Sequence, residues 1–339
     1  MEQNLLASKQ ARVDYIDLLR AIGIFVMIMG HVSFGGFFNK WIHIYHMPMF
    51  FIISGHFFKE QDFSSLIKKR AKTLLVPYCV FGLIHLIIYF VRIGSIDSHA
   101  FYLLLWENTA ENGIPIAGAL WFLTAMFFSE LLFRIVQSNK GSNVVKTIVS
   151  LSIATVGMAC ARYLPFRLPW AIDVGFVGVG LCQFGKLIKD KGQKVLEIRF
   201  TFSIIGILVF SGLGLVNGYV NLRQGYYGVW PLFWINAVGM TISLWNIARC
   251  VNDWIEDKGI FQKVMPWIRG MGRDSIIFLC LNQLAILFSG DLIGLMIPTD
   301  NGVILLVKKL LILLITMIEL YFAQKAVMGT NFKILVGKW

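Results

Sequence analysis

Residues 14–33 read DYIDLLRAIGIFVMIMGHVS, and this stretch decides the fold class of the chain. Nearly all of it is apolar, and crossing a hydrocarbon core of about 30 Å takes roughly 20 such residues as a helix. A helix is required because lipid offers the backbone no water to hydrogen-bond. The stretch also holds Asp17, Arg20 and His31, although ionisable side chains are costly inside a bilayer and mark functional sites there. It therefore predicts a membrane helix with a functional polar face.

The composition of the whole chain agrees with a membrane protein. Its 339 residues are 57% hydrophobic and 15% charged, and the mean hydropathy is +0.70. A soluble domain carries about 25% charged residues, so this chain cannot cover a water-facing surface. The five cysteines lie in or beside apolar runs without paired spacing, which predicts buried thiols rather than disulfides or metal ligands. We expect one domain over residues 1–339.

About ten stretches are long and apolar enough to cross a bilayer as helices. They lie at about 16–34, 41–58, 73–91, 117–137, 144–161, 169–188, 200–217, 229–248, 274–296 and 303–327. We therefore expect an all-α polytopic integral membrane protein with about ten transmembrane helices.

The positive charges predict the orientation of these helices. Of the 31 Lys and Arg residues, 23 fall on segments that share a side with the N-terminus, and 5 fall on the opposite loops. Positive loops face the cytoplasm, so we expect both termini to be cytoplasmic in a multi-pass protein of the plasma membrane. The net charge of +12 is spread over many loops. It therefore indicates orientation and contact with membrane lipids, not nucleic-acid binding.

The ionisable groups of the first helix form one stripe. At 100° per residue, Arg20 and His31 point within about 20° of each other, and His31 is about 16 Å further along the axis. Asp17 lies one turn before Arg20. The alternative is a buried Asp17–Arg20 ion pair with a histidine that only packs. Three groups in a stripe favour function, and we expect Arg20 and His31 to face one water-lined passage.

The residue types of the stripe indicate a chemistry. The planar guanidinium of Arg20 suits a phosphate-bearing ligand that enters from the cytoplasm. The imidazole of His31 suits general-base catalysis near neutral pH. A long ligand anchored at Arg20 would present its reactive end near His31.

Further motifs accompany the pair Arg20 and His31, which ten residues separate. They are HMPMFFIISG (46–55), KKRAKTLLVPY (68–78), LWFL (120–123) and MGRDSIIFLCLN (271–282). In this order they resemble the motifs of the membrane-bound acyltransferase-3 family, in the branch related to fucose 4-O-acetylases. The resemblance covers most of the chain.

The resemblance implies transfer of an acyl group, usually acetyl, from cytoplasmic acetyl-CoA to a hydroxyl of an envelope glycan or a lipid-linked sugar. It implies that His31 is the catalytic base and that Arg20 binds the donor. We assign Asp17 to the catalytic residues with His31. Its carboxylate would pair with Arg20 and hold it in place, or tune the mouth of the donor site. The basic stretch then offers Lys69, Arg70 and Lys72 to the phosphates of coenzyme A.

The sequence departs from the family pattern at two of these motifs. Two arginines three residues apart are usual in the basic stretch, where this chain has either Lys69 with Lys72 or Arg70 with Thr73. In the late motif Asp274 replaces an asparagine and Asn282 replaces a histidine, so Asn282 retains hydrogen bonding without acid–base chemistry.

Four residues are candidates for acceptor binding. They are His46, Ser54, Trp121 and Asn282. His46 is either an orienting group or a hydrogen-bonded core histidine. Trp121 is either a platform for a sugar or an interfacial belt residue. Ser54 with Gly55 also fits a close contact between two helices.

Two local arrangements complete the expectations. His31, His43 and His46 lack an acidic or thiolate partner at ligand spacing, so we expect no metal. Glu130 and Arg134 are one helical turn apart, and we expect them to pair.

A different class of membrane protein also fits the polar stripe. A secondary transporter or flippase would use Asp17, Arg20 and His31 as an intramembrane relay. Such proteins show interrupted helices in two related halves, and the sequence shows no convincing matching half. It also lacks the motifs GxSxG, HExxH and the P-loop. The acyltransferase is therefore the favoured interpretation.

Overall fold

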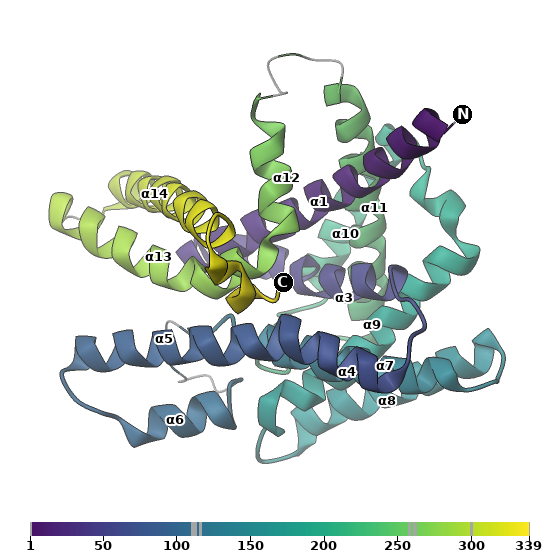
Figure 1. Cartoon of the computed structure of the whole chain (residues 1–339), viewed down its shortest axis with the longest axis horizontal. Coiled ribbons are helices and arrows are strands. Elements are labelled where there is room, and N and C mark those ends of the chain that lie inside the picture. The colour runs from purple at the N-terminus through teal and green to yellow at the C-terminus, as the bar shows by residue number, and fades with distance from the viewer. Residues whose placement is uncertain are drawn as a thin grey trace.

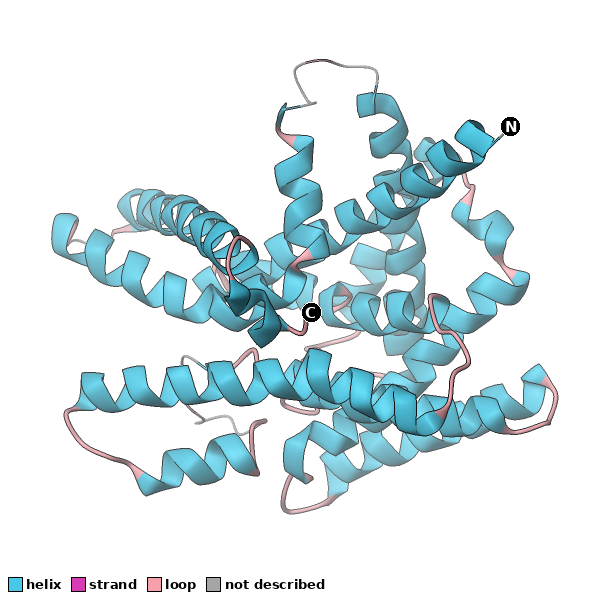
Figure 2. Cartoon of the chain, in the orientation of Figure 1, coloured by secondary structure: helices cyan, strands magenta, loops and turns pink. Residues whose placement is uncertain are grey.

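The described parts of the chain consist of helices joined by loops and turns. The structure is a computed structural model, and it describes residues 2–109, 114, 117–256, 259, 263–298 and 301–338. Within these ranges there is no β-strand, and one isolated bridge joins Asn221 to Tyr226 (Figure 2). The all-α prediction is confirmed.

The helices follow the apolar runs of the sequence, because each run satisfies its own backbone as a helix. They are α1 (Glu2–Val32), α2 (Gly36–His43), α3 (His46–His56), α4 (Phe63–Arg70), α5 (Val76–Ile93), α6 (Ser98–Leu105), α7 (Trp121–Ser138), α8 (Asn143–Tyr163), α9 (Ile172–Lys191), α10 (Phe200–Val216), α11 (Trp230–Glu256), α12 (Met265–Arg273), α13 (Ser275–Met296) and α14 (Gly302–Met328). Except at 41–58, each stretch expected to cross the membrane corresponds to one helix.

The stretch 41–58 is two helices rather than one, because of Pro48. α2 ends at His43 and α3 begins at His46. The ring of a proline clashes with the carbonyl four residues earlier and gives that carbonyl no donor, and here that residue is Ile44. Proline is tolerated in the first turn of the following helix, where Pro48 lies.

Five helical segments among the described residues are long and apolar enough to cross a membrane. They are Asp14–Val32, Phe63–Ile93, Asn143–Tyr163, Pro169–Lys191 and Ser275–Met296. The shorter helix α10 is also strongly apolar. The chain is therefore a membrane protein with five candidate membrane-spanning helices.

Figure 1 shows how these helices are arranged. The segment 63–93 is one continuous rod formed by α4, a π-helical turn at Ala71–Leu75 and α5. α13 and α14 pack side by side as a pair, and α1 packs against α12. α9 lies among α3, α7 and α8 and is mostly buried.

The contact between α3 and α9 brings two backbones together. A Cβ added at Gly55 would overlap the carbonyl oxygen of Cys182, and one at Gly185 would overlap that of Ile52. Small residues permit such close approach between membrane helices. The predicted close contact at Ser54 and Gly55 is confirmed, and it holds the helix of His46 in place.

Candidate active site

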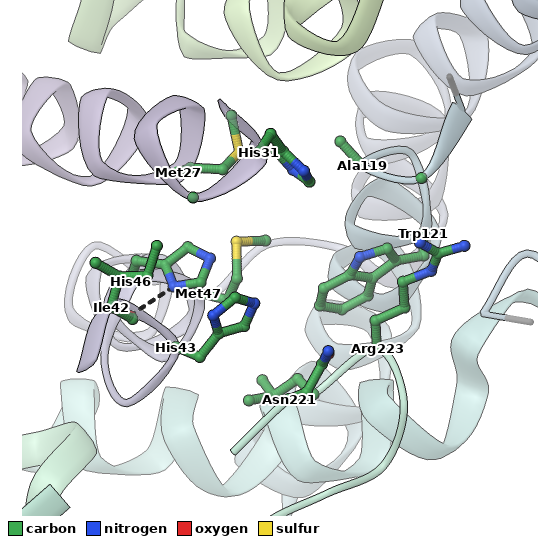
Figure 3. A pocket seen from close by; sticks show the side chains of 13 residues that line it. Met27, His31, Ile42, His43, His46, Met47, Ala119, Trp121, Asn221 and Arg223 are labelled. Atoms are coloured by element: carbon green, nitrogen blue, oxygen red, sulfur yellow. Dashed lines mark hydrogen bonds between the residues drawn. The ribbon is translucent and has the colours of Figure 1, made fainter. Parts of the chain in front are cut away.

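A cavity of about 200 Å³ opens at the C-terminal end of α1. Figure 3 shows side chains of α1, the α2–α3 segment, α7 and the loop 217–229 converging on it. The lining residues are Met27, Gly30, His31, Ile42, His43, His46, Met47, Gly118, Ala119, Trp121, Asn221, Leu222 and Arg223. Three of the ten site residues expected from the sequence line this cavity: His31, His46 and Trp121.

His31 presents its imidazole to the cavity from the last turn of α1, and the side chain is exposed. Its Nδ1 lies 3.2 Å from Nε2 of Gln283 on α13. The amide of Gln283 therefore fixes the plane of the ring. In this orientation its N–H donates to Nδ1, so Nε2 of the neutral ring carries the proton; with the amide turned over, Nδ1–H donates to Oε1 of Gln283 and Nε2 keeps its lone pair for a ligand in the cavity. Gln283 was not expected from the sequence, because only the packing of α13 beside α1 brings it to His31.

His43 and His46 add two more rings with fixed orientation. Nδ1 of His43 donates to the carbonyl of Asn39 at 2.6 Å, and Nδ1 of His46 donates to that of Ile42 at 2.7 Å. Both neutral rings thus keep Nε2 as an acceptor. The rings meet edge-on, with centroids 5.0 Å apart. Figure 3 shows the bond from the His46 ring to the Ile42 carbonyl.

The loop 217–229 supplies the only charged residue of the described cavity wall, Arg223. Its backbone carbonyl accepts from Nη1 of Arg167 at 2.8 Å, and Arg167 also pairs with buried Asp173 at 2.7 Å. The ion pair therefore anchors the loop to α9. Neither Asn221 nor Arg223 was expected at the site, because a loop of this length carries no periodic signal in sequence.

Trp121 and Gly118 form the wall opposite the histidines. Trp121 is the first residue of α7, as expected, and its indole faces the cavity (Figure 3). A Cβ at Gly118 would lie 2.8 Å from Nη1 of Arg223 and 3.1 Å from Nε2 of Gln283. The missing side chain thus lets both polar groups approach the same wall.

A second polar cluster lies toward the other end of α1. Asp17 and Arg20 form an ion pair at 3.4 Å, and the charges of Arg20 and Arg70 are close enough to interact. Arg70 pairs with buried Glu130. We call Asp17, Arg20, Arg70 and Glu130 the inner cluster. These residues belong to α1, α4 and α7, which are far apart in the sequence.

The pairing of Glu130 corrects one expectation. Glu130 binds Arg70 and accepts from Oγ of Ser54 at 2.5 Å, whereas Arg134 donates to the carbonyl of Gln61 at 2.8 Å. The predicted Glu130–Arg134 pair is therefore wrong. Arg70 reaches Glu130 from the rod α4–α5. The spacing of residues within α7 could not predict this partner from another helix.

The remaining expected residues take different places. Lys69 and Lys72 are exposed near the π-helical turn, beside Arg70. Ser54 belongs to the inner cluster through Glu130. Asn282 is fully buried and donates to the carbonyl of Leu279 at 2.6 Å. Neither Ser54 nor Asn282 is among the described residues that line the cavity.

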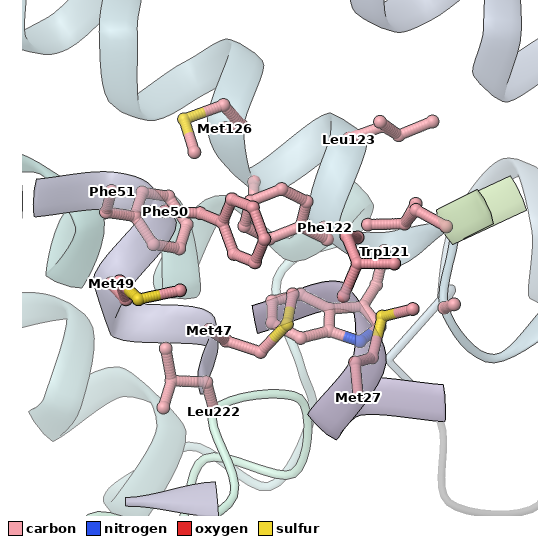
Figure 4. Close-up of a cluster of buried hydrophobic side chains, with 14 of the residues drawn as sticks. Met27, Met47, Met49, Phe50, Phe51, Trp121, Phe122, Leu123, Met126 and Leu222 are labelled. Carbon is pink, nitrogen blue, oxygen red and sulfur yellow. The ribbon is translucent and has the colours of Figure 1, made fainter. Parts of the chain in front are cut away.

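Apolar side chains separate the inner cluster from the cavity. The cavity wall on α1 begins at Met27 and does not include Arg20. One turn before Met27, Gly23 packs against Met49 and Phe50. Figure 4 shows these side chains in a cluster with Met47 and Phe122. The open passage expected between Arg20 and His31 is thus filled in this structure, mainly by methionine and phenylalanine.

The part of the chain that the structure describes contains no set of metal ligands. No three His, Cys, Asp or Glu side chains gather there as a metal-binding group.

Comparison with known proteins supplies the family. The family model described as an acyltransferase domain, of the acyltransferase-3 type, matches residues 13–320. No curated protein and no solved structure matches the chain. The matched region contains α1 from Val13 onward, both polar clusters and the cavity, and it extends over most of the sequence. The chain belongs to the acyltransferase-3 family of membrane acyltransferases.

Proposed function

We propose that this protein is an O-acetyltransferase of the plasma membrane. It takes acetyl from cytoplasmic acetyl-CoA and transfers it to a hydroxyl of an envelope glycan or a lipid-linked sugar. One domain with about ten spans and both termini in the cytoplasm carries the reaction. The observation that supports it most is the imidazole of His31, which Gln283 orients toward a cavity at the end of a membrane helix.

His31 acts as the general base in this proposal. With Oε1 of the Gln283 amide accepting from Nδ1–H, the free Nε2 takes the proton from the acceptor hydroxyl as the oxygen attacks the thioester carbonyl. The new ester bond forms, the carbon–sulfur bond breaks, and the proton passes from His31 to the departing thiolate of coenzyme A. His46 and His43 accept hydrogen bonds from the acceptor through their own Nε2 atoms. Trp121 gives the acceptor an apolar face to pack on.

The inner cluster binds the donor. Arg20 and Arg70, with Lys69 and Lys72 beside them, offer cations to the phosphates of coenzyme A. Asp17 and Glu130 orient the two arginines. The arm of the donor must then replace the apolar side chains that fill the path to His31. Methionine suits this role because its thioether side chain is flexible and repacks easily.

The likeness to the branch of fucose 4-O-acetylases supports a sugar hydroxyl as the acceptor. HMPMFFIISG, which carries that likeness, forms α3 and supplies His46 and Met47 to the cavity wall. Membership in the acyltransferase-3 family favours this enzyme over a transporter or flippase. Purified protein that releases coenzyme A from acetyl-CoA only with an acceptor present distinguishes the two classes.

Replacing Gln283 tests how His31 is oriented. We expect Gln283→Leu to lower kcat about 10-fold to 100-fold without changing KM for acetyl-CoA, as loss of a partner of a functional histidine does. Gln283→Glu places a carboxylate beside the imidazole, which favours the imidazolium. The acid limb of the kcat–pH profile then moves to higher pH, because the base form appears only above the raised pKa. Unchanged kcat and pH profile in both variants would remove Gln283 from the mechanism.

Replacing Arg20 tests the donor site. We expect Arg20→Ala to raise KM for acetyl-CoA about 10-fold to 100-fold, because a hydrogen bond to a charged group contributes about 1.5–3 kcal/mol. With acetyl-pantetheine, which lacks the nucleotide phosphates, wild type and variant become alike. Arg92→Ala is the matched control, since Arg92 pairs with Asp291 away from both clusters. A loss that is equal for both donors would contradict phosphate binding by Arg20.

A further inference from the structure

A second, larger cavity lies beside the candidate active site. Its volume is about 530 Å³, against about 200 Å³ for the cavity at His31. It lies between the C-terminal end of α8, the N-terminal end of α11 and the loop 217–229. The lining residues are Met158, Ala161, Arg162, Tyr163, Tyr219, Gln224, Gly225, Tyr226, Tyr227, Gly228 and Trp230. We call this cavity the aromatic groove.

A row of aromatic side chains links the groove to the active-site cavity. The ring of His43, which lines the active-site cavity, lies 6.0 Å from that of Tyr219. The ring of Tyr219 lies 6.0 Å from that of Tyr226. Tyr219 therefore stands between the two spaces, and an acceptor that occupies both would pass beside its ring.

One loop forms a wall of both spaces. Asn221 lines the active-site cavity, and its Nδ2 donates to the hydroxyl of Tyr219 at 3.0 Å and to Oε1 of Gln224 at 2.9 Å, which both line the groove. Backbone hydrogen bonds of 2.8 and 3.0 Å join Asn221 to Tyr226. With the anchor from Arg167, these bonds make the loop a preformed wall, which lowers the ordering cost of binding.

The chemistry of the groove fits a chain of sugars. Tyrosine and tryptophan offer rigid rings with a polar edge, so they pack on the apolar face of a pyranose and still bond its hydroxyls. Tyr163, Tyr219 and Tyr226 are 77%, 45% and 47% exposed. Arg162 and Gln224 add donors for ring and hydroxyl oxygens. An interfacial belt also uses tyrosine and tryptophan, but here the rings converge on a hollow with polar walls.

We infer that the aromatic groove binds further sugar units of the acceptor, next to the unit that is acetylated at His31. The enzyme therefore acts on an oligosaccharide or polysaccharide in preference to a single sugar. This inference rests on the proposed acetyl transfer, and it adds the length of acceptor that the protein recognises.

The test measures how the rate depends on acceptor length. Envelope polysaccharide from cells that lack this protein is cut by mild acid into fragments of one to about six sugars, and the purified enzyme acetylates each size. We expect kcat/KM to rise with length for the wild type. Tyr226→Ala lowers kcat/KM about tenfold for the long fragments, the size of about 1.4 kcal/mol of lost contact, and leaves the single sugar unchanged. Tyr226→Phe keeps the ring and behaves as the wild type.

Tyr102→Ala is the matched control, because Tyr102 is 46% exposed on α6 and lies outside the groove. A Tyr226→Ala enzyme with the wild-type dependence on length would overturn the inference, and so would a wild type that acetylates all sizes equally well. Either result would leave acetyl transfer itself intact. If neither the wild type nor any variant releases coenzyme A with any fragment, the proposed function fails instead.

Discussion

Replacing His31 by alanine is expected to lower acetyl transfer by about 1,000-fold or more, within the range of general-base catalysis. The variant loses the imidazole of His31. Among the described residues of the cavity wall, only this ring is oriented by an amide from another helix. Without it, the acceptor hydroxyl must attack the thioester while it still holds its proton. The measurement is the initial rate of coenzyme A release by purified protein at saturating donor and acceptor.

The control for this experiment is His99→Ala, which we expect to match the wild type. His99 is an exposed histidine on α6, where its ring stacks on Tyr102 and faces neither polar cluster. Both variants must enter the membrane at the wild-type level for the comparison to count. A purified His31→Ala protein that turns over at nearly the wild-type rate would remove His31 from the reaction.

The second large effect is on stability. Gly55→Ala places a methyl group against the backbone carbonyl of Cys182 on α9, and a carbonyl in a packed helix cannot move aside as a flexible side chain does. We expect α3 to separate from α9 at a cost of about 3 kcal/mol or more. The measurement is thermal unfolding of the purified protein in detergent, together with the yield of folded protein.

Gly212→Ala on α10 provides the comparison, because a Cβ there meets no atom within 4 Å. Alanine favours a helix over glycine by about 1 kcal/mol, so this variant should be as stable as the wild type or slightly more stable. A Gly55→Ala protein that unfolds at the same temperature as Gly212→Ala would show that the two helices are not in close backbone contact.

The sequence predicted the helices well because each apolar run satisfies its backbone alone. Of the four acceptor-binding candidates, His46 and Trp121 line the cavity at His31, whereas Ser54 and Asn282 are not among its described lining residues. The break at 41–58 follows from Pro48 and the carbonyl of Ile44. The rule for proline in helices therefore predicts this break, whereas the length and hydropathy of the stretch do not. These expectations depend on interactions within a few residues of one another.

Contacts between helices were beyond the sequence pattern. Nothing in the spacing shows that Gln283 rather than Asn282 faces His31, because that depends on the rotation of α13 against α1. The rule that pairs residues one turn apart failed at Glu130, where Arg70 arrives from another helix. Arg223 reached the cavity through an anchored loop, which no periodicity describes.

In the proposed reaction, the filled path between Arg20 and His31 would act as a gate. Ionisable groups of α1 make the two ends polar, while Met27, Met49 and Phe50 occupy the space between them. A donor arm that replaces these side chains would bring its thioester to His31 and exclude water at the same time. The gate would then protect the thioester from hydrolysis when no donor is correctly seated.

The most direct test of the central claim uses the purified protein in sealed vesicles, with acetyl-labelled acetyl-CoA outside and the polysaccharide acceptor inside. Only protein molecules inserted with residues 68–78 facing the outside of the vesicle can bind the acetyl-CoA there. We expect label to appear on the enclosed acceptor, with one coenzyme A released outside for each acetyl transferred, and we expect His31→Ala to abolish both. Label that reaches the acceptor equally well with His31→Ala, or vesicles in which acetyl-CoA is never consumed, would contradict the central claim.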